Sequence, residues 1–267
     1  PLPLAYGASV TTPEGLVWIG GNNNEEVSGQ VFFVNWDGEK QQLHISELPS
    51  LPTPLDNLSA TYADGHLYVA GGKGKSQTAP IGKDGSQTAP TNPLFSLQLT
   101  PSLQKEWVRL PDFPGPVRVQ PVLTAQQSGD GIRLYLAGGF QPVSPHQEAI
   151  VCPDMLSYHP ETTQWRNEVF LPSFADGSHR TITGGCAIAS GDSSIFLIGG
   201  VNYNRFRDAL NHPEPDYLRH PTDWYKFNTS LLQYNTFTKR WTHLGDYKEL
   251  ARAGAGIANN ANMTIKI

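Results

Sequence analysis

Short apolar runs that end in a glycine pair recur along the chain. Each run is too short for a helix of ordinary length, and in the fourth run β-branched Ile198 and Val201 flank the glycine pair, so the pattern predicts a buried strand. The four runs occupy residues 16–21, 67–72, 134–139 and 194–200. Their first glycines lie 51, 67 and 61 residues apart, which indicates a repeated unit with loops of variable length.

Each apolar run has companion strands at matching offsets. A strand of small residues is predicted before it, at 6–11, 58–64, 122–127 and 185–189. An alternating strand is predicted after it, at 31–36, 94–99, 156–160 and 231–235, followed by a fourth strand near a tryptophan or a Leu-Pro pair. A repeated unit of four strands is typical of a β-propeller blade, which needs neighbours to cover its faces.

The glycine pair after the second strand, the aromatic residue in the third and the tryptophan near the fourth resemble the kelch repeat. The resemblance implies an all-β fold, with one kelch β-propeller domain over residues 1–267. Four four-stranded blades are expected at about 5–50, 58–114, 120–173 and 183–247, and the start of a fifth at 251–267, with its first strand at 251–257. Because a propeller protects its strand edges by closing, we expect a ring of about six blades, completed by a second chain or a missing segment.

Two insertions lengthen the loops between second and third strands. The insertion at 76–90 contains Ser-Gln-Thr-Ala-Pro twice and predicts a surface loop without chemistry. The insertion at 202–228 is rich in Asn, Arg, His and aromatic residues, and 205–211 is expected to form a helical turn that stops before Pro213. Long loops on a rigid scaffold often carry functional residues, so we expect such residues in the second insertion.

Composition and charge narrow the classes of function. The net charge is −5 and no long Lys/Arg run occurs, so a nucleic-acid partner is not expected. No apolar stretch reaches the roughly 18 residues of a membrane span. The eight histidines lack metal-site spacing, and neither a G-x-S-x-G elbow nor a phosphate loop is present, so we expect no metal or cofactor. Cys152 and Cys186 are expected to be free thiols, with a disulfide as the alternative.

The segment from Gly199 through Asn202 to Phe206, with the return through Phe227-Asn228, resembles one kelch group. These are the bacterial sialic acid mutarotases, also called N-acetylneuraminate epimerases, in which a G-G-V-N-x-x-x-F blade carries such an insertion. The Ala-Gly-Ala-Gly at 253–256 also matches. The G-G-V-N blade is third in the ordinary member and fourth here, which resembles the cyclically permuted mutarotase group. A ring tolerates permutation because its contacts are between neighbours.

The resemblance implies interconversion of the α and β anomers of N-acetylneuraminic acid by a periplasmic or secreted bacterial protein, without a cofactor. Opening the sugar ring needs a base at the anomeric hydroxyl and an acid at the ring oxygen. In the family, a G-E-x-K-P-G-x-R segment holds the suspected catalytic Glu and Arg. This sequence lacks that segment, so the catalytic residues are unknown.

Candidate substrate-binding residues lie on loops that open on one face of a propeller, before the first strands and after the glycine pairs. Guanidinium groups on these loops suit an anionic sugar, because arginine binds a carboxylate through two hydrogen bonds. The candidates are Tyr6, Asp56, Arg118, Arg180, Asn202, Arg205 and Arg252. The alternative for Arg118, Arg180 and Arg252 is a solvated loop charge or a group that holds neighbouring blades by hydrogen bonds to carbonyls, and for Asn202 it is a turn former.

Two other functions fit the same repeat, because kelch propellers include enzymes and binding scaffolds. One is a non-catalytic propeller that binds a glycan or a protein partner. The other is a copper enzyme of the galactose-oxidase type, which would need a set of Tyr and His ligands on the channel face.

Overall fold

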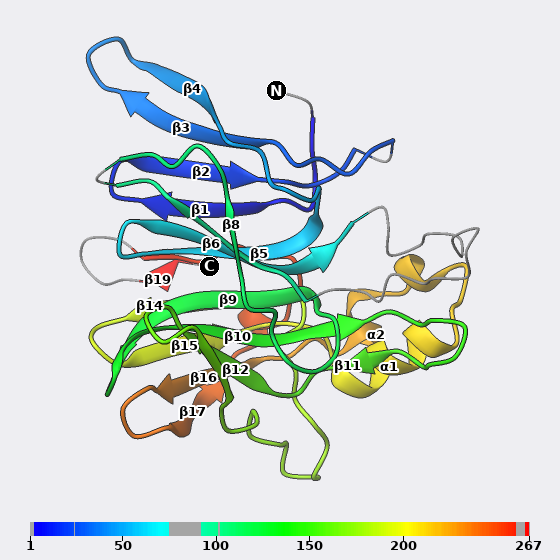
Figure 1. Cartoon of the computed structure of the whole chain (residues 1–267). Helices are drawn as coiled ribbons and strands as arrows, with labels where there is room; N and C mark the ends of the chain where they lie inside the picture. The colour runs from blue at the N-terminus through cyan, green and yellow to red at the C-terminus, as the bar shows by residue number, and fades with distance from the viewer. Residues whose placement is uncertain (1–2, 24, 75–91, 101, 260–264, 267) are drawn as a thin grey trace. The chain divides into compact units, whose positions relative to one another are not determined.

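The computed structural model describes residues 3–23, 25–74, 92–100, 102–259 and 265–266, and its strands form four main antiparallel sheets (Figure 1). The repeated insertion predicted at 76–90 lies outside the described residues. The chain divides into two compact units, which we call unit 1 (Pro1–Phe113) and unit 2 (Pro114–Ile267). Each unit is described by itself, and the prediction of one domain stays a prediction.

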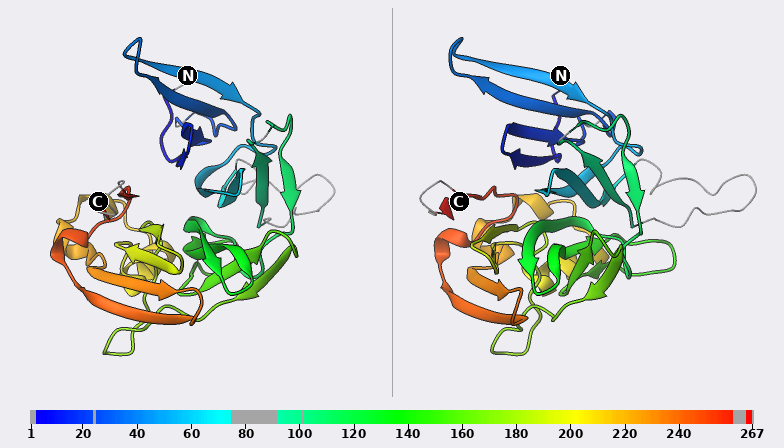
Figure 2. Two further views of the ribbon diagram at one scale, coloured as in Figure 1. Left: turned by 90° about the vertical axis from the view of Figure 1, so that its left-hand side faces the viewer. Right: turned by 60° about the vertical axis from the view of Figure 1, so that its left-hand side comes forward.

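Unit 1 contains the first two predicted blades, and in each the strands follow one another in sequence order. The first sheet consists of β1 (Ala8–Thr12), β2 (Gly15–Ile19), β3 (Val31–Asp37) and β4 (Gln42–Leu48). The second consists of β5 (Asp56–Ala63), β6 (His66–Lys73), β7 (Leu94–Gln98) and β8 (Val108–Leu110). The first strands of the two sheets, β1 and β5, lie side by side (Figure 2).

Unit 2 contains the third and fourth predicted blades. The third sheet holds β9 (Val119–Ser128), β10 (Gly131–Gln141), β12 (Met155–His159) and β13 (Gln164–Asn167), and the short β11 (Ile150–Val151) adds a fifth strand at the end of β10. The fourth sheet holds β14 (Cys186–Ser190), β15 (Ser194–Ile198), β16 (Ser230–Asn235) and β17 (Arg240–Asp246). Again the first strands, β9 and β14, are neighbours.

The insertion after β15 forms three short helices. They are α1 (Tyr203–Asn211), η2 (Tyr217–Arg219) and α2 (Thr222–Tyr225). The helical turn predicted at 205–211 is confirmed, and it begins two residues earlier because Asn202 caps α1. The helix ends before Pro213, as expected, since proline lacks the N–H group that would continue it.

The first strand predicted at 251–257 is wrong. The chain there forms η3 (Lys248–Leu250) and continues without a strand until β18 (Ala258–Asn259), which pairs with β19 (Ile265–Lys266). Gly254 has a φ of 72°, a left-handed backbone that cannot belong to a regular strand. The first strand, predicted to start at residue 6, begins instead at Ala8. The cause is the same, because Tyr6 has a φ of 59°.

Each unit has an apolar core between its two sheets. In unit 1 the core includes Val17 and Ile19 of the first sheet and Leu67, Val69 and Leu97 of the second, all fully buried. Burying one such side chain contributes roughly 1.5–3 kcal/mol. The indole of Trp107 completes this core, and its N–H group donates to the carbonyl of Pro49 at 2.7 Å. The predicted tryptophan of the second blade therefore fastens that blade to the first.

The glycine pairs combine a left-handed backbone with close contact to the following segment. Gly199 and Gly200 have φ values of 66° and 89°. A Cβ on Gly199 would lie 2.7 Å from the carbonyl oxygen of Arg252, and one on Gly200 would lie 3.0 Å from that of Thr183. Both positions therefore exclude a side chain, which explains why the pair recurs.

A second left-handed residue recurs at the start of each blade. We call these the blade-start residues: Tyr6, Asn57, Gln120, Gly184 and Gly254, with φ values of 59°, 51°, 53°, 68° and 72°. Within a unit they are joined by backbone hydrogen bonds. In unit 1 the N–H of Asn57 donates to the carbonyl of Tyr6 at 2.7 Å, and in unit 2 the N–H of Gly254 donates to that of Gly184 at 2.7 Å. The blade-start residues therefore link successive blades.

Candidate functional site

In unit 1, polar side chains gather where the first strand of the second blade begins. Asp56 is only 2% exposed, and its carboxylate accepts hydrogen bonds from the side-chain amides of Asn22 at 2.6 Å and Asn57 at 2.7 Å. Asn22 follows the first glycine pair, so the contact joins two blades. Tyr6, which precedes β1, is 61% exposed. Of the predicted residues, Tyr6 is therefore exposed to solvent, whereas Asp56 is buried and bound by two side-chain amides.

In unit 2, Arg118 lies inside the protein. None of its side chain is exposed, and its guanidinium donates to the carbonyl of Gly138 and to the carboxylate of Asp154, each at 2.8 Å. Its Nε has no hydrogen-bond partner among the described residues. The bond to Gly138 is to a carbonyl of β10, in the blade that Arg118 itself precedes, so it does not link neighbouring blades. A role of Arg118 in sugar binding stays a prediction.

Arg180 is also turned toward the backbone. It is 8% exposed, and it donates to the carbonyls of Pro172 at 2.9 Å and Ser173 at 3.1 Å. Its guanidinium lies 4.0 Å from the centre of the Phe174 ring. Burial lowers the pKa of the guanidinium from its usual value. The geometry shows a group that holds the loop before the fourth blade, and sugar binding by Arg180 stays a prediction.

Asn202 and Arg205 belong to the first helix after β15, and Arg252 lies two residues after η3. The side chain of Asn202 accepts a hydrogen bond from the backbone N–H of Arg205 at 3.1 Å, which caps α1. The guanidinium of Arg205 lies 4.8 Å from the centre of the Trp224 ring. Arg252 is exposed, it donates to the carbonyl of Glu249, and its own carbonyl accepts from Gly200. Both of these arginines present exposed guanidinium groups.

Aromatic side chains organise the insertion that the sequence singled out. The ring of His220 stacks on Trp224 with centroids 3.8 Å apart, and its Nε2 lies 3.2 Å from a Glu214 carboxylate oxygen. Phe206 of α1 contacts Phe140 of β10 edge to face at 5.1 Å. The insertion is therefore anchored to the third blade. The sequence showed the richness in aromatic residues but not which of them pair.

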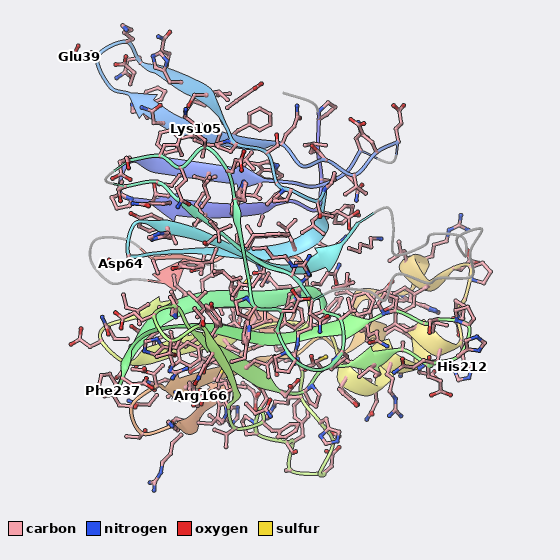
Figure 3. The ribbon with its side chains drawn as sticks, in the orientation of Figure 1. Glu39, Asp64, Lys105, Arg166, His212 and Phe237 are labelled. Carbon is pink, nitrogen blue, oxygen red and sulfur yellow. The ribbon has the colours of Figure 1, made fainter. Side chains whose placement is uncertain are left out.

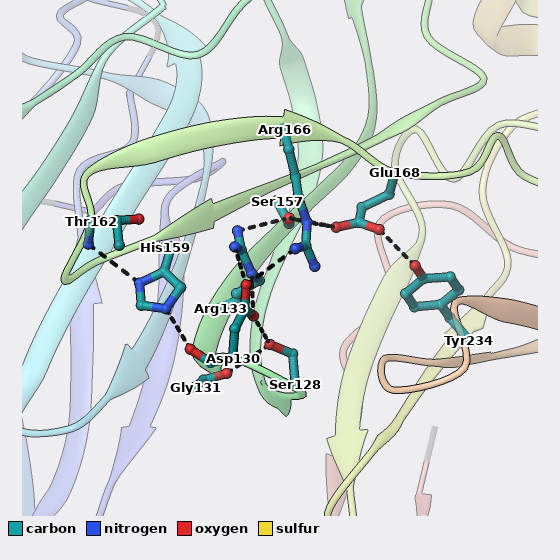
Figure 4. Close-up of polar contacts among 10 residues, drawn as sticks. All are labelled: Ser128, Asp130, Gly131, Arg133, Ser157, His159, Thr162, Arg166, Glu168 and Tyr234. Atoms are coloured by element: carbon teal, nitrogen blue, oxygen red, sulfur yellow. Dashed lines mark hydrogen bonds and ion pairs between the residues drawn. The ribbon is translucent and has the colours of Figure 1, made fainter.

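A charged network within unit 2 was not predicted from the sequence (Figure 4). Glu168, with a side chain 3% exposed, accepts hydrogen bonds from Arg166 and Ser157 at 2.6 Å each and from the Tyr234 hydroxyl at 2.8 Å. Burial raises the pKa of Glu168, but the hydrogen bonds from Ser157, Arg166 and Tyr234 outweigh it and leave the pKa lowered. Burial, followed by the bond to Glu168, raises the pKa of Tyr234.

The network continues to the turn between β9 and β10. Arg133 and Arg166 both contact the carboxylate of Asp130, at 2.7 and 3.3 Å. The hydrogen bond from Arg133, and next that from Ser128, holds the pKa of Asp130 well below its usual range. The spacing of these residues gave no signal in the sequence, because they come from three strands and a turn. The network connects the third blade to Tyr234 of the fourth.

Three further expectations concern thiols, membranes and metals. Cys152 and Cys186 are both buried and free, as predicted, and burial raises the pKa of Cys152 to about 11. In the part of the chain that the structure describes, no helix has the length and hydropathy needed to cross a membrane. Within the same residues, no group of three His, Cys, Asp or Glu side chains is placed to hold a metal ion.

Comparison with known proteins gives relatives that share one name. An N-acetylneuraminate epimerase from Shigella sonnei is 25% identical over 234 residues, covering 82% of this chain and 55% of the relative. An N-acetylneuraminate epimerase from Pasteurella multocida is 25% identical over 182 residues, covering 63% and 44%. The chain therefore spans about half the length of these relatives.

Among solved structures, the one titled "Structure of YjhT" matches with a TM-score of 0.59 and 22% identity, covering 80% of this chain and 58% of that one. This likeness and the four main antiparallel sheets confirm the predicted kelch β-propeller fold. The family described as N-acetylneuraminate epimerase matches residues 48–267, which is most of the chain. The chain belongs to the N-acetylneuraminate epimerase family.

Proposed function

We propose that this chain provides blades of a protein that interconverts the α and β anomers of N-acetylneuraminic acid. The observation that carries the proposal is the family match over residues 48–267, which includes the Asn202 blade and its insertion. The periplasmic or secreted location expected from the resemblance belongs to the same proposal.

The sugar is an anion, so its carboxylate needs a cationic partner. Arg205 and Arg252 are the two predicted arginines that are exposed, although Arg252 also donates to the carbonyl of Glu249, whereas Arg118 and Arg180 are buried against protein carbonyls. We therefore assign carboxylate binding to Arg205 or Arg252. Arg205 lies over Trp224, and stacking on the ring limits its freedom before a ligand binds.

The only catalytic groups that the reaction needs are a base and an acid, which transfer protons. A base removes the proton of the anomeric hydroxyl, the bond between the anomeric carbon and the ring oxygen breaks, and an acid protonates that oxygen. Closure on the opposite face of the ketone then gives the other anomer. No acid or base is assigned to this chain, because the family's Glu and Arg segment is absent from the sequence.

The test is the rate of anomer exchange, followed by NMR on N-acetylneuraminic acid freshly released as one anomer. Wild-type protein should shorten the approach to equilibrium, and an unchanged rate would remove the proposal. Arg205→Gln should weaken sugar binding, whereas the matched Arg219→Gln, in the same insertion and paired with Asp216, should not. Binding of the sugar without faster exchange would favour the non-catalytic glycan-binding propeller.

Asn202 has two possible roles that substitution can separate. Asn202→Ala removes the helix cap and should lower the stability of α1 by about 1 kcal/mol, whereas Asn202→Ser keeps a capping oxygen. If Asn202 acts only as a cap, the serine variant should restore wild-type exchange. If its amide contacts the sugar, the serine variant should be as stable as wild type and still bind weakly.

A further inference from the structure

The blade-start residues share a left-handed backbone but differ in their side chains. In the fourth blade and after it the position is filled by Gly184 and Gly254, which adopt a left-handed backbone without steric cost. The other three are Tyr6, Asn57 and Gln120, all polar, and each holds the same strained conformation. Because glycine satisfies the backbone here, a polar side chain at this position indicates a purpose other than setting the backbone conformation.

In unit 1 two of these residues lie within one hydrogen-bonded group. Asp56 is buried, and its two carboxylate oxygens accept one amide N–H each, from Asn22 at 2.6 Å and from Asn57 at 2.7 Å. An amide that donates through its nitrogen to a fixed carboxylate has its own orientation fixed. The carboxylate thus sets the direction of both carboxamides at once.

The backbone around these side chains is equally constrained. Asn22 exchanges two hydrogen bonds of 2.8 Å with Ala5, and the N–H of Asn57 donates to the carbonyl of Tyr6 at 2.7 Å. Groups held in place before a ligand arrives lose little freedom on binding. Asn22 and Asn57 are half-buried and Tyr6 is exposed, so the group lies at the surface.

We propose that Tyr6, Asn22 and Asn57 form a sugar-contacting surface, with Asp56 as its positioning residue. Carboxamides both donate and accept hydrogen bonds, which suits hydroxyl and acetamido groups, and a tyrosine ring packs against the apolar face of a pyranose. The inference rests on the proposed function and extends it by naming, within unit 1 alone, residues whose groups suit the hydroxyl and acetamido groups of the sugar. Asp56, predicted from the sequence as a substrate ligand, acts instead through the two asparagines.

Glycine substitution removes the side chains while keeping the backbone. Asn57→Gly and Tyr6→Gly should both bind N-acetylneuraminic acid about tenfold more weakly, the effect of losing one good contact. Tyr6→Gly should melt at or near the wild-type temperature, whereas Asn57→Gly should melt at a lower temperature because the buried Asp56 carboxylate loses one of its two amide donors. The measurement is calorimetric titration with the sugar, alongside thermal unfolding of each variant.

Two residues offer matched controls. Gln41 and Asp64 also have left-handed backbones, with φ values of 53° and 46°, and both lie in hairpin turns. Asp64 follows the end of β5 and so lies at the opposite end of that strand from Asn57 (Figure 3). Gln41→Gly and Asp64→Gly should leave the affinity unchanged. A loss of affinity equal to that of Asn57→Gly would overturn the inference.

Asp56→Asn tests the positioning role through a mutant cycle. The variant keeps the shape of the side chain but cannot accept from both amides, so affinity should fall about tenfold in the wild-type background. In an Asn22→Ala, Asn57→Gly background the same change should have no further effect on affinity. A purely structural Asp56 would give equal losses in both backgrounds, and that result would overturn its assignment.

The outcomes separate this inference from the proposed function. If the wild-type chain neither binds nor interconverts N-acetylneuraminic acid, the proposed function fails and the inference fails with it. If wild type binds and Asn57→Gly and Tyr6→Gly bind equally well, only the inference is overturned.

Discussion

At the residue scale, positive φ angles explain most of the glycine placement in this chain. In three of the pairs the first glycine meets the backbone or a side chain of the segment that starts the next blade, as Gly20 meets Leu55, Gly138 meets Ile182 and Gly199 meets Arg252. The glycine pairs could be recognised from the sequence because they recur. The reason for the first glycine of these pairs could not, because the neighbour that excludes a Cβ comes from 35 to 53 residues further along.

Gly199→Ala should therefore destabilise unit 2. The new Cβ would lie 2.7 Å from a backbone oxygen at a φ of 66°, and we expect a loss of about 2–3 kcal/mol in the free energy of unfolding. Gly38→Ala is the control, since a Cβ there meets nothing within 4 Å and should change stability by less than about 0.5 kcal/mol. Urea unfolding measures both, and equal effects would contradict the explanation.

At the element scale, polar contacts fasten one blade to the next. In unit 1, Trp107 of the second blade donates to Pro49, which follows the first sheet. In unit 2, Tyr234 of β16 donates to Glu168, which follows β13, and Glu168 is also bound by Arg166. The strand positions were predictable from alternation, but the partners of Glu168 were not, because they depend on how two sheets face each other.

Acid should weaken the Glu168 network. The pKa of Glu168 is lower in the folded protein than its ordinary value of 4.5, so the network stabilises the fold fully above pH 4.5. As the pH falls below that value the unfolded chain binds the proton first, and this stabilisation disappears as the pH passes through the folded pKa. The measurement is the free energy of unfolding as a function of pH.

Two variants give the expected size of the effect. Glu168→Gln should cost about 2–3 kcal/mol at pH 7, because Arg166 loses its nearest carboxylate, and should flatten the acid slope. Tyr234→Phe removes one of the three hydrogen bonds to the carboxylate and should cost about 1 kcal/mol. An acid slope in Glu168→Gln as steep as in wild type would show that other groups cause it.

At the scale of the whole molecule, the described surface includes an apolar area on the first sheet. Trp36, Leu43 and Ile45 are 56%, 62% and 53% exposed. Trp36 and Leu43 are paired across β3 and β4, so they share one face of the sheet, and Ile45 lies on that face two residues on. An exposed apolar edge strand favours association with other chains.

Leu43→Lys combined with Ile45→Thr should reduce self-association without unfolding the protein. Both side chains are mainly in water, so the free energy of unfolding should change by less than about 1 kcal/mol. Light scattering against concentration measures the association. Unchanged scattering would show that this face is not the cause. Leu103→Lys, at another exposed leucine, serves as the control for added charge.

The sequence by itself determined the blades, the order of their strands and the positions of the glycine pairs, because alternation and left-handed turns are local properties of the chain. It also located the insertion and, within it, the helix α1, since Asn202 and Pro213 mark the two ends of that helix. Only the tertiary structure decided what the charged side chains do. Arg118 binds Asp154, 36 residues away, and Asp56 binds Asn22, 34 residues away. A buried charge takes its role from the partner that the fold brings to it, and that partner is invisible in a local pattern.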